Sequence, residues 1–416
     1  MQCHARCSTR SLAVGMAVLL ALVVLFVSVS GSSMARERFE SNEAIPFSSE
    51  YYADAASRFG AALSPSARII VGGESRPATI SDYDVLGLHI GWYSDWRTSA
   101  TPLTPHGMRY AQIILVRESD YPTNTLELTS TVASAPKGSL WIIGNEPERL
   151  TQKALGVVQG SRTPEQYAEI YHDVYNIIKG QDAGSWVAIG GIVQPTPLRL
   201  QWLERTLAAY HDRYGSEMPV DVWNIHMQIL PEKTGSWGAE IPVGIDATQG
   251  EMFNFSLETG FYDNANPVLF RQLVISFREW MKAHGFQNKP LIISEYGVLF
   301  PSSYIGYGAG YGDPNFGDMV LISFIRETFE FMVDARDPSV GYAADDYHLV
   351  QQWLWYSIND QPYDFATGKG YNGSLFSHVD PTQMTIFGVA WREYMHTLLG
   401  YPRALLPLVA RRFSRP

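Results

Sequence analysis

The chain has 416 residues and a formal net charge of -11, with 46% apolar and 18% charged residues. This apolar fraction is enough for a large buried core and excludes a globally disordered chain. The acidic balance, with no basic stripe in the body of the chain and no glycine-rich phosphate loop, argues against a nucleic-acid or nucleotide partner. The length permits two average domains or one α/β barrel with insertions.

The first 35 residues are predicted to be a secretory signal or a membrane anchor. Arg6 and Arg10 precede an uncharged apolar run over 12–29, which small residues of cleavage-site type follow. The run is long enough for either role, so a signal peptide and an uncleaved anchor helix both remain open. In both cases the rest of the chain is expected to be exported, either secreted or held at the outer face of the membrane. A membrane contact is expected only through this segment, if it is uncleaved.

Cysteine and histidine usage limits the chemistry. Both cysteines, Cys3 and Cys7, precede the apolar run, so neither a disulfide framework nor thiolate chemistry is expected in the body of the chain. The histidines are scattered, without His-Glu-x-x-His or another metal-ligand spacing. We therefore expect no metal and no other cofactor.

The rest of the chain divides into three segments. Residues 36–66 are polar and rich in Ser and Ala, and are expected to form a linker or an irregular collar. Residues 67–402 are expected to form the folded domain. Residues 403–416 form a basic tail, expected to be a solvated end.

Strand-like and helix-like segments alternate along the folded domain. Seven apolar runs read as strands, over 85–90, 112–116, 140–144, 187–193, 222–227, 291–294 and 352–356. Thr163-Pro164, Thr196-Pro197 and Asn266-Pro267 each place a capping residue before a proline, which indicates helix starts. This alternation predicts parallel βαβ units and an α/β fold, a (β/α)8 TIM barrel. The barrel needs an eighth strand, for which 68–71 is the best candidate.

Two of these runs end in a carboxylate. The run at 140–144 ends in Asn145-Glu146-Pro147, and the run at 291–294 ends in Glu295-Tyr296-Gly297. Counting back from the last strand places Glu146 after strand 4 and Glu295 after strand 7, at the end of a barrel where active sites lie. Cleaving a glycosidic bond with retention of configuration needs one protonated and one ionised carboxyl group. The two glutamates therefore indicate a glycosidase.

With both motifs in this order, the chain resembles the retaining glycoside hydrolases of clan A, barrel enzymes that include families 5, 39 and 128. The resemblance covers roughly 85–400. It implies that Glu146 is the acid/base, that Glu295 is the nucleophile, and that Asn145 binds the sugar hydroxyl beside the reacting carbon. The implied substrate is a β-linked oligosaccharide or polysaccharide. Glu295 is expected to be kept ionised by a nearby Arg or His, whereas the pKa of Glu146 is expected to be raised.

The resemblance also implies further substrate-site residues. His226 matches a histidine on strand 6 near the nucleophile, and Gln228 stands where many members have Tyr. Trp353 or Trp355 matches a tryptophan that forms the floor of the sugar site. These two lie two apart and so point to the same side of their strand, which leaves plain core packing open for at least one. Arg117 is the counterpart of the arginine that holds the nucleophile ionised.

Three long connections follow strands 6, 7 and 8, over 229–266, 301–315 and 358–379. They are rich in aromatic residues, among them Trp237 and Tyr371, and their predicted place on the catalytic face favours substrate contact over packing across the barrel top. Trp92, with Tyr93 and Trp96 close behind it, and Tyr296 of the second motif are also expected to contact substrate.

Two other classes of function remain open. One is a catalytically inactive carbohydrate-binding or structural cell-surface protein on the same barrel, which Gln228 and the uncertain match of Arg117 keep open. The other is a metal-dependent barrel hydrolase, for which ligands are lacking. A separation of about 5–5.5 Å between the two carboxyl groups favours the retaining enzyme.

Overall fold

A computed structural model of the chain describes residues 51–121, 124–150, 160–255, 261–306, 312–364 and 366–401. The expected signal or anchor, residues 36–50 of the 36–66 segment and the basic tail lie outside these residues. Among the described helices, none combines the length and the hydrophobicity that crossing a bilayer requires.

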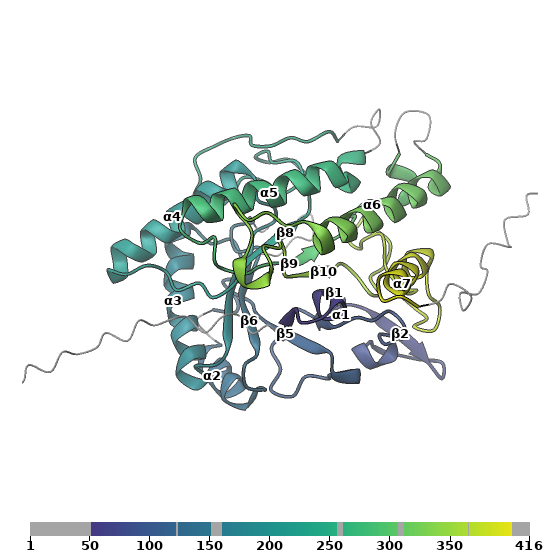
Figure 1. The fold of residues 1–416 in the computed structure, drawn as a ribbon, viewed down its shortest axis with the longest axis horizontal. Helices are drawn as coiled ribbons and strands as arrows, with labels where there is room; N and C mark the ends of the chain where they lie inside the picture. Colours follow the sequence, from purple (N-terminus) through teal and green to yellow (C-terminus); the bar gives the residue numbers. More distant parts are fainter. Residues whose placement is uncertain are drawn as a thin grey trace, which may run out of the picture. The chain divides into compact units, whose positions relative to one another are not determined.

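Eight parallel strands form the central sheet (Figure 1), in the spatial order β7-β6-β5-β4-β1-β10-β9-β8. Their bounds are β1 (Phe59–Ala62), β4 (Trp92–Ser94), β5 (Arg109–Ile114), β6 (Leu140–Asn145), β7 (Trp186–Gly191), β8 (Trp223–Met227), β9 (Leu291–Tyr296) and β10 (Gln352–Trp355). Parallel bridges from Ala188 to Val222 and from Ile192 to Ile225 connect β7 with the β8 side. The sheet is thus a nearly closed barrel, and the predicted (β/α)8 architecture is confirmed.

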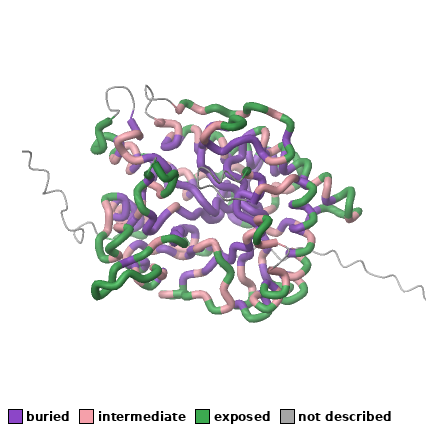
Figure 2. The backbone as a smooth tube through the Cα atoms, turned by 180° about the vertical axis from the view of Figure 1, so that it is seen from behind, coloured by how far each residue is buried: buried purple, intermediate pink, exposed green. Residues whose placement is uncertain are grey.

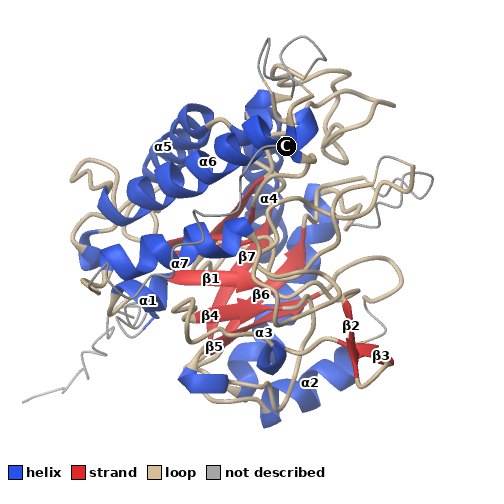
Figure 3. Ribbon diagram, turned by 90° about the vertical axis from the view of Figure 1, so that its right-hand side faces the viewer, coloured by secondary structure: helices blue, strands red, loops and turns tan. Residues whose placement is uncertain are grey.

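Helices surround the strands (Figure 3). They are α1 (Ala55–Arg58), α2 (Thr125–Ser134), α3 (Pro164–Gln181), α4 (Pro197–Tyr214), α5 (Pro267–Ala283), α6 (Pro314–Asp334) and α7 (Ile386–Leu398). The predicted starts of three of them are confirmed: α3, α4 and α5 each have proline at the first helical position, and Thr163 and Gln166 form a capping box at α3. The crossovers from β5 onward each contain a helix, so strand and helix alternate as expected.

The first barrel strand is not the one predicted. Residues 68–71 form β2, which pairs antiparallel with β3 (Glu74–Pro77) in a hairpin outside the barrel, and three of its four residues are exposed. The first barrel strand is instead β1, within the segment expected to be a linker or collar. Its sequence, Phe-Gly-Ala-Ala, is too short and its side chains too small to give an apolar signal. Gly60 is needed there, because a Cβ would lie 2.5 Å from the Trp92 ring.

The expected strand at 85–90 is also wrong, since these residues form turns. Val85, Leu88 and Ile90 are buried, which explains the apolar run, but their backbone lies outside the sheet. The strand begins two residues later, at Trp92. These two corrections do not change the predicted order of the barrel strands: β6 is the fourth and β9 is the seventh.

Buried residues form two layers, one inside the barrel and one between strands and helices. All eight strands or their immediate flanks contribute to one cluster of buried residues, which identifies it as the barrel interior: Ala62, Trp92, Ala111, Ile113, Leu140, Ile142, Ala188, Val222, Ile292 and Leu354, with Tyr51, Tyr52 and Tyr342. The alternate residues of these strands belong to a second, larger cluster that includes the helix faces. Figure 2 shows this buried chain at the centre, with exposed segments around it.

Candidate active site

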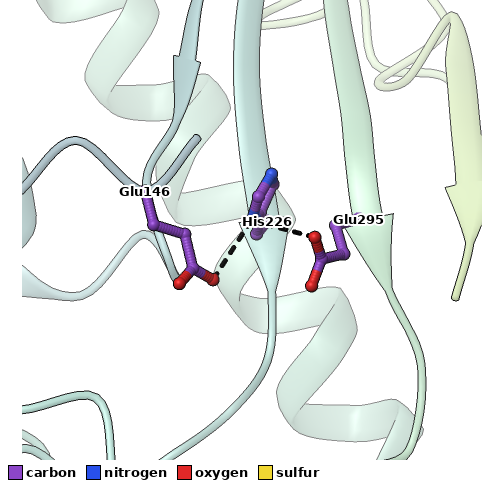
Figure 4. A group of neighbouring side chains, drawn as sticks. All are labelled: Glu146, His226 and Glu295. Carbon is purple, nitrogen blue, oxygen red and sulfur yellow. Dashed lines mark hydrogen bonds and ion pairs between the residues drawn. The ribbon is translucent and has the colours of Figure 1, made fainter. Parts of the chain in front are cut away.

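Three side chains from the fourth, sixth and seventh barrel strands meet at the carboxyl end of the barrel. Glu146 directly follows β6, His226 lies on β8 and Glu295 lies on β9. Nδ1 of His226 lies 3.3 Å from Oε1 of Glu146 and 4.0 Å from Oε2 of Glu295, so that the imidazole stands between the carboxylates (Figure 4). One oxygen of each carboxylate and a ring nitrogen lie within 4.8 Å of one another. The structure thus brings together the two glutamates and the histidine that the sequence indicated.

A β-bulge lets two consecutive residues of β9 face the site. The pairing of β9 with β8 shifts just before His226, which pairs with Glu295 and leaves Ser294 as the extra residue. Ser294 Oγ lies 3.1 Å from Nε2 of His226. Bulges re-aim side chains in this way, and here the bulge brings a hydroxyl and a carboxylate to the same histidine.

Glu146 is held by a neighbour that the sequence reading missed. Its side chain is almost fully buried, and Nη1 of Arg149 lies 2.9 Å from its Oε2. Glu146 also has a left-handed backbone, with φ 43°, and its amide donates to the carbonyl of Gly191 at the end of β7. Such a conformation is strained for a residue other than glycine and is typical of functional sites. Arg149 directly follows the Asn-Glu-Pro-Glu run, so a cation near the motif was the available signal.

Glu295 is oriented by an amide and a tyrosine. Nε2 of Gln228 donates to its Oε1 at 2.6 Å, and the hydroxyl of Tyr371 donates to Oε1 of the same glutamine. Tyr371 comes from the connection after the eighth strand, where substrate contact was predicted. Gln228 therefore occupies the site, as expected, and supports the glutamate where many of the resembling enzymes have Tyr.

The pKa values of the two carboxyl groups are shifted in directions opposite to those expected. Burial raises the pKa of Glu146, but the charges and hydrogen bonds of Arg149 and His226 outweigh it, so that the pKa falls to about 2. Burial also raises the pKa of Glu295; His226 partly offsets this and the charge of Glu146 adds to it, which leaves the pKa at about 7. The expectation was wrong because the guanidinium that enters the site pairs with Glu146.

Three aromatic residues expected in the substrate site face away from it. Trp353 and Trp355 are fully buried in the helix-facing layer, where Trp353 packs on Phe59 and Trp355 on Tyr296. Tyr296 belongs to the same layer. The period of two placed the tryptophans on one side of β10, but that side is the outer one, because Leu354 between them fills the barrel.

The aromatic residues that do surround the glutamates are Trp96, Tyr356 and Tyr371. The Tyr356 ring lies 5.2 Å from Trp96 and 4.6 Å from Tyr371, centroid to centroid. Burial raises the pKa of both tyrosines, and the charge of Glu295 raises it further; for Tyr356 the charge of Asp360, to which its hydroxyl donates at 2.8 Å, is the larger of the two charge effects. Trp96 donates from Nε1 to Oδ1 of Asn145 at 2.8 Å, which places the predicted Asn145 beside the group. Tyr356 was not predicted, because the sequence of β10 does not show which of its alternate residues point into the barrel.

Trp92, Arg117 and Trp237 do not join the group. Trp92 fills the barrel interior and donates from Nε1 to the Arg58 carbonyl. Arg117 forms an ion pair with Asp120, three residues further on, instead of holding the nucleophile.

Trp237 packs in an aromatic cluster that the connections after strands 6 and 7 form, 5.2 Å from Phe300 and 6.3 Å from Phe255. These two connections therefore pack on one another through this cluster.

The three central side chains also have the atom types of a metal site. Glu146, His226 and Glu295 are, among the described residues, the one group of three or more potential ligands close enough to hold an ion. The guanidinium of Arg149 on Glu146 opposes a cation there, and we assign no metal to the group.

No family model matches the chain, and neither does any curated protein sequence. Solved structures give looser likenesses. An endo-β-1,3-glucanase of GH128 (subgroup II) from Sorangium cellulosum is 14% identical, over 81% of this chain and 98% of that chain, with a TM-score of 0.46. A glucosidase from Croceicoccus marinus is 14% identical over 82% and 67%, with a TM-score of 0.49. A GH128 (subgroup VII) oligosaccharide-binding protein from Trichoderma gamsii is 13% identical over 76% and 93%, with a TM-score of 0.41.

At these identities and TM-scores, none of the three assigns a reaction to this chain. The chain's own architecture defines a (β/α)8 barrel with paired glutamates at the carboxyl ends of its fourth and seventh strands, and in this arrangement the chain resembles the clan A glycoside hydrolases.

Proposed function

We propose that the chain is an exported retaining glycoside hydrolase that cleaves β-linked glycans, with Glu295 as nucleophile and Glu146 as acid/base. The single observation that supports this most is the carboxylate pair, with one oxygen of each glutamate within 4.8 Å of the other. Retaining enzymes hold their carboxyl groups about 5–5.5 Å apart, whereas inverting enzymes need about 6.5–9.5 Å to admit a water.

The contacts of each glutamate support its role. Gln228 binds Oε1 of Glu295, so that Oε2 is the oxygen directed toward the anomeric carbon. Glu146 donates its proton to the leaving oxygen as the bond to Glu295 forms, and then takes a proton from the water that hydrolyses the glycosyl-enzyme. His226, between the two, stabilises negative charge on either carboxylate.

Glycan hydrolysis tests the proposal directly. Purified protein is incubated with β-glucans, xylans and mannans, and released ends are measured for the wild type, Glu295→Gln and Glu146→Gln. We expect Glu295→Gln to abolish turnover, because an amide cannot attack the anomeric carbon. Activity that survives Glu295→Gln refutes the assigned nucleophile.

Azide separates the role of Glu146 from a structural one. In Glu146→Gln the second step lacks its base, but azide attacks the glycosyl-enzyme without losing a proton. We expect azide to accelerate this variant and to give a glycosyl azide of retained configuration, read by NMR. An inverted product, or no rescue on an activated aryl glycoside, contradicts the mechanism.

Export belongs to the same proposal and rests on the first 35 residues. We expect the full chain to appear outside the cell or on its surface, where added protease reaches it, and a chain lacking those residues to stay inside. Protease protection of the full chain in intact cells would count against export.

A second candidate function is glycan binding without turnover. The observation that favours it is the buried pair of Glu146 with Arg149, because a carboxylate held ionised has no proton to donate. Binding of a glycan in calorimetry, with no hydrolysis over the pH range in which the fold is stable, supports this candidate.

A further inference from the structure

The two oxygens of Glu146 face different partners. Oε1 lies toward His226, on the side of Glu295, whereas Oε2 accepts from Nη1 of Arg149. Nη2 of Arg149 donates to the carbonyl of Gly238 at 3.0 Å. The guanidinium thus binds the oxygen of Glu146 that His226 does not contact, and the Arg149 side chain is 14% exposed against 2% for Glu146. The cation is the more accessible member of the pair.

This arrangement puts the site in the wrong state for the proposed reaction. Among the described residues, the titratable groups whose charges interact with Glu146 include Arg149, His226, Glu148, Glu295 and Tyr371. The direct contact of Arg149 keeps Glu146 ionised. The mechanism needs the reverse, with the proton on Glu146 and the negative charge on Glu295. In the structure, however, Glu295 is the glutamate that holds a proton more readily.

We propose that the substrate is an acidic glycan, in which the carboxylate of a uronic acid unit takes over Arg149 from Glu146. Once the Arg149 guanidinium pairs with the substrate, Glu146 is a buried carboxylate without its cation and beside the negative charge of the substrate carboxylate. The proton held at Glu295 then moves to Glu146, across the short distance that His226 spans. No proton is gained or lost, and the site reaches the state in which Glu295 attacks and Glu146 donates. This inference rests on the proposed function.

An acidic sugar is favoured over a neutral one because the exchange must replace a charge. Arginine pairs strongly with carboxylates through parallel N–H donors, and a sugar hydroxyl offers no charge with which to displace one. Arg149 also donates to the backbone carbonyl of Gly238, and this bond stays in place during the exchange. The carboxylate therefore gives both the recognition and the activation of the site.

The test uses matched oligosaccharides that differ only in this group. Cellohexaose and laminarihexaose are compared with the same oligosaccharides oxidised at C6. The oxidised units carry carboxylates, so that a carboxylate can reach Arg149 whichever subsite lies beside this residue. We expect kcat/KM for the oxidised member of the cleaved pair to be higher by about tenfold or more, the usual range for a charge-assisted pair. Equal or faster cleavage of the neutral member overturns the inference and leaves the proposed function standing.

Substitution of Arg149 separates recognition from mere support of the fold. In Arg149→Gln we expect the preference for the oxidised glycan to vanish. On the neutral glycan we expect the alkaline limb of the pH profile to move to higher pH, because Glu146 is no longer paired with a cation. Arg149→Lys is expected to keep most of the preference. The matched control is Arg117→Gln, which removes a second i,i+3 arginine–carboxylate pair outside the site. A preference unchanged in Arg149→Gln overturns the inference.

Binding tests the inference even if no glycan is cleaved. Calorimetry with the wild type is expected to show tighter binding of the oxidised hexasaccharide by about tenfold, and Arg149→Gln is expected to remove this difference. Preferential binding without hydrolysis refutes the proposed enzyme and retains an acidic-glycan site. Equal affinities for the two members of both pairs refute the acidic-glycan site.

Discussion

At the scale of single residues, the support of Glu295 depends on which way the Gln228 amide faces. The Tyr371 hydroxyl donates to Oε1 of the glutamine, and this fixes Nε2 toward the carboxylate. A tyrosine from the connection after strand 8 and a glutamine directly after strand 6 thus share the task of supporting Glu295, at a position where many of the enzymes that the chain resembles have Tyr. The departure from the family pattern is compensated within the site.

Removing that hydroxyl tests the arrangement. In Tyr371→Phe the amide can turn its oxygen toward Glu295, which removes a donor from the ionised form and raises the pKa of the carboxyl group further. We expect kcat to fall by about tenfold or more and the acid limb of its pH profile to move to higher pH. Tyr363→Phe is the control, because this tyrosine lies in the same connection but packs on Phe300 of the aromatic cluster, 5.9 Å from it, and the variant should leave the limb in place. An unmoved limb in Tyr371→Phe would show that Gln228 needs no such support.

The raised pKa of Glu295 also predicts a pH-dependent stability difference. Its pKa rises from 4.5 when unfolded to about 7 when folded, so the folded state loses stability relative to the unfolded state as pH rises through this window. Glu295→Gln cannot ionise and avoids this loss. We therefore expect the free energy of unfolding of the variant to exceed that of the wild type increasingly between pH 4.5 and 7, by about 3 kcal/mol at most.

Glu146→Gln gives the opposite sign and serves as the comparison. The pKa of Glu146 is lowered to about 2, so its ionised form stabilises the fold above pH 4.5 and this contribution fades as pH falls toward 2. The variant is expected to be less stable than the wild type near neutral pH, with a deficit that shrinks below pH 4.5. Urea unfolding across pH 2 to 8 measures both, and parallel curves for all three proteins over this range would contradict these two pKa shifts.

At the scale of elements, the sequence predicted those strands whose buried runs are long and bounded by breakers. β6, β8 and β9 were found in this way, and with them the positions of both glutamates. β1 was not predicted, because the side chains of Phe-Gly-Ala-Ala are mostly too small to give an apolar pattern, although neighbouring elements bury all four residues. Turns at 85–90 were mistaken for a strand because burial alone does not distinguish the two.

The direction of a side chain was harder to predict than its element. In a barrel both faces of each strand are buried, so a strand shows no alternation of apolar and polar residues. Its sequence therefore does not show which residues point into the barrel and which point toward the helices. Trp353, Trp355 and Tyr296 were assigned to the site for this reason, and Tyr356 was not. His226 and Gln228 were expected near the glutamates because their motif has a counterpart in the resembling enzymes, and both contact these carboxylates in the structure.

One contact joins an element of the outer layer to the strand that carries Glu146. Tyr167 of α3 donates its hydroxyl to the Ile143 carbonyl at 2.6 Å and accepts from the Gly190 amide at 2.8 Å, which bridges β6 and β7 just before the site. The hydroxyl therefore satisfies two buried backbone groups where these strands approach the active end.

In Tyr167→Phe both backbone groups lose their partner. We expect a loss of about 2–4 kcal/mol in the free energy of unfolding, since each unsatisfied buried group costs about 1–3 kcal/mol. Tyr171→Phe, one turn along the same helix, removes a single bond to the Pro219 carbonyl and should cost less. Equal losses in urea unfolding would show that Tyr167 contributes through packing alone.

At the scale of the whole molecule, a fully buried arginine joins the fourth strand, α4 and the connection after the sixth strand. Arg199 of α4 pairs with Glu148, two residues after Glu146, and with Glu232, which follows β8. Its Nη2 also donates to the carbonyls of Ala239 and Glu240. The same connection carries Gly238, whose carbonyl accepts from Arg149, so this network helps to position the partner of Glu146.

Replacing Arg199 by Met leaves two carboxylates buried without their cation. Such an uncompensated charge costs about 3–5 kcal/mol, so we expect Arg199→Met to lose that much stability in urea unfolding. Adding Glu148→Gln and Glu232→Gln should restore part of the loss, because amides carry no charge to desolvate. The control on the same helix is Arg213→Met, whose pair with Glu169 is about half exposed and contributes about 0–1 kcal/mol. A triple variant no more stable than Arg199→Met would show that the backbone bonds of Arg199, and not its charge, hold the connection to the barrel.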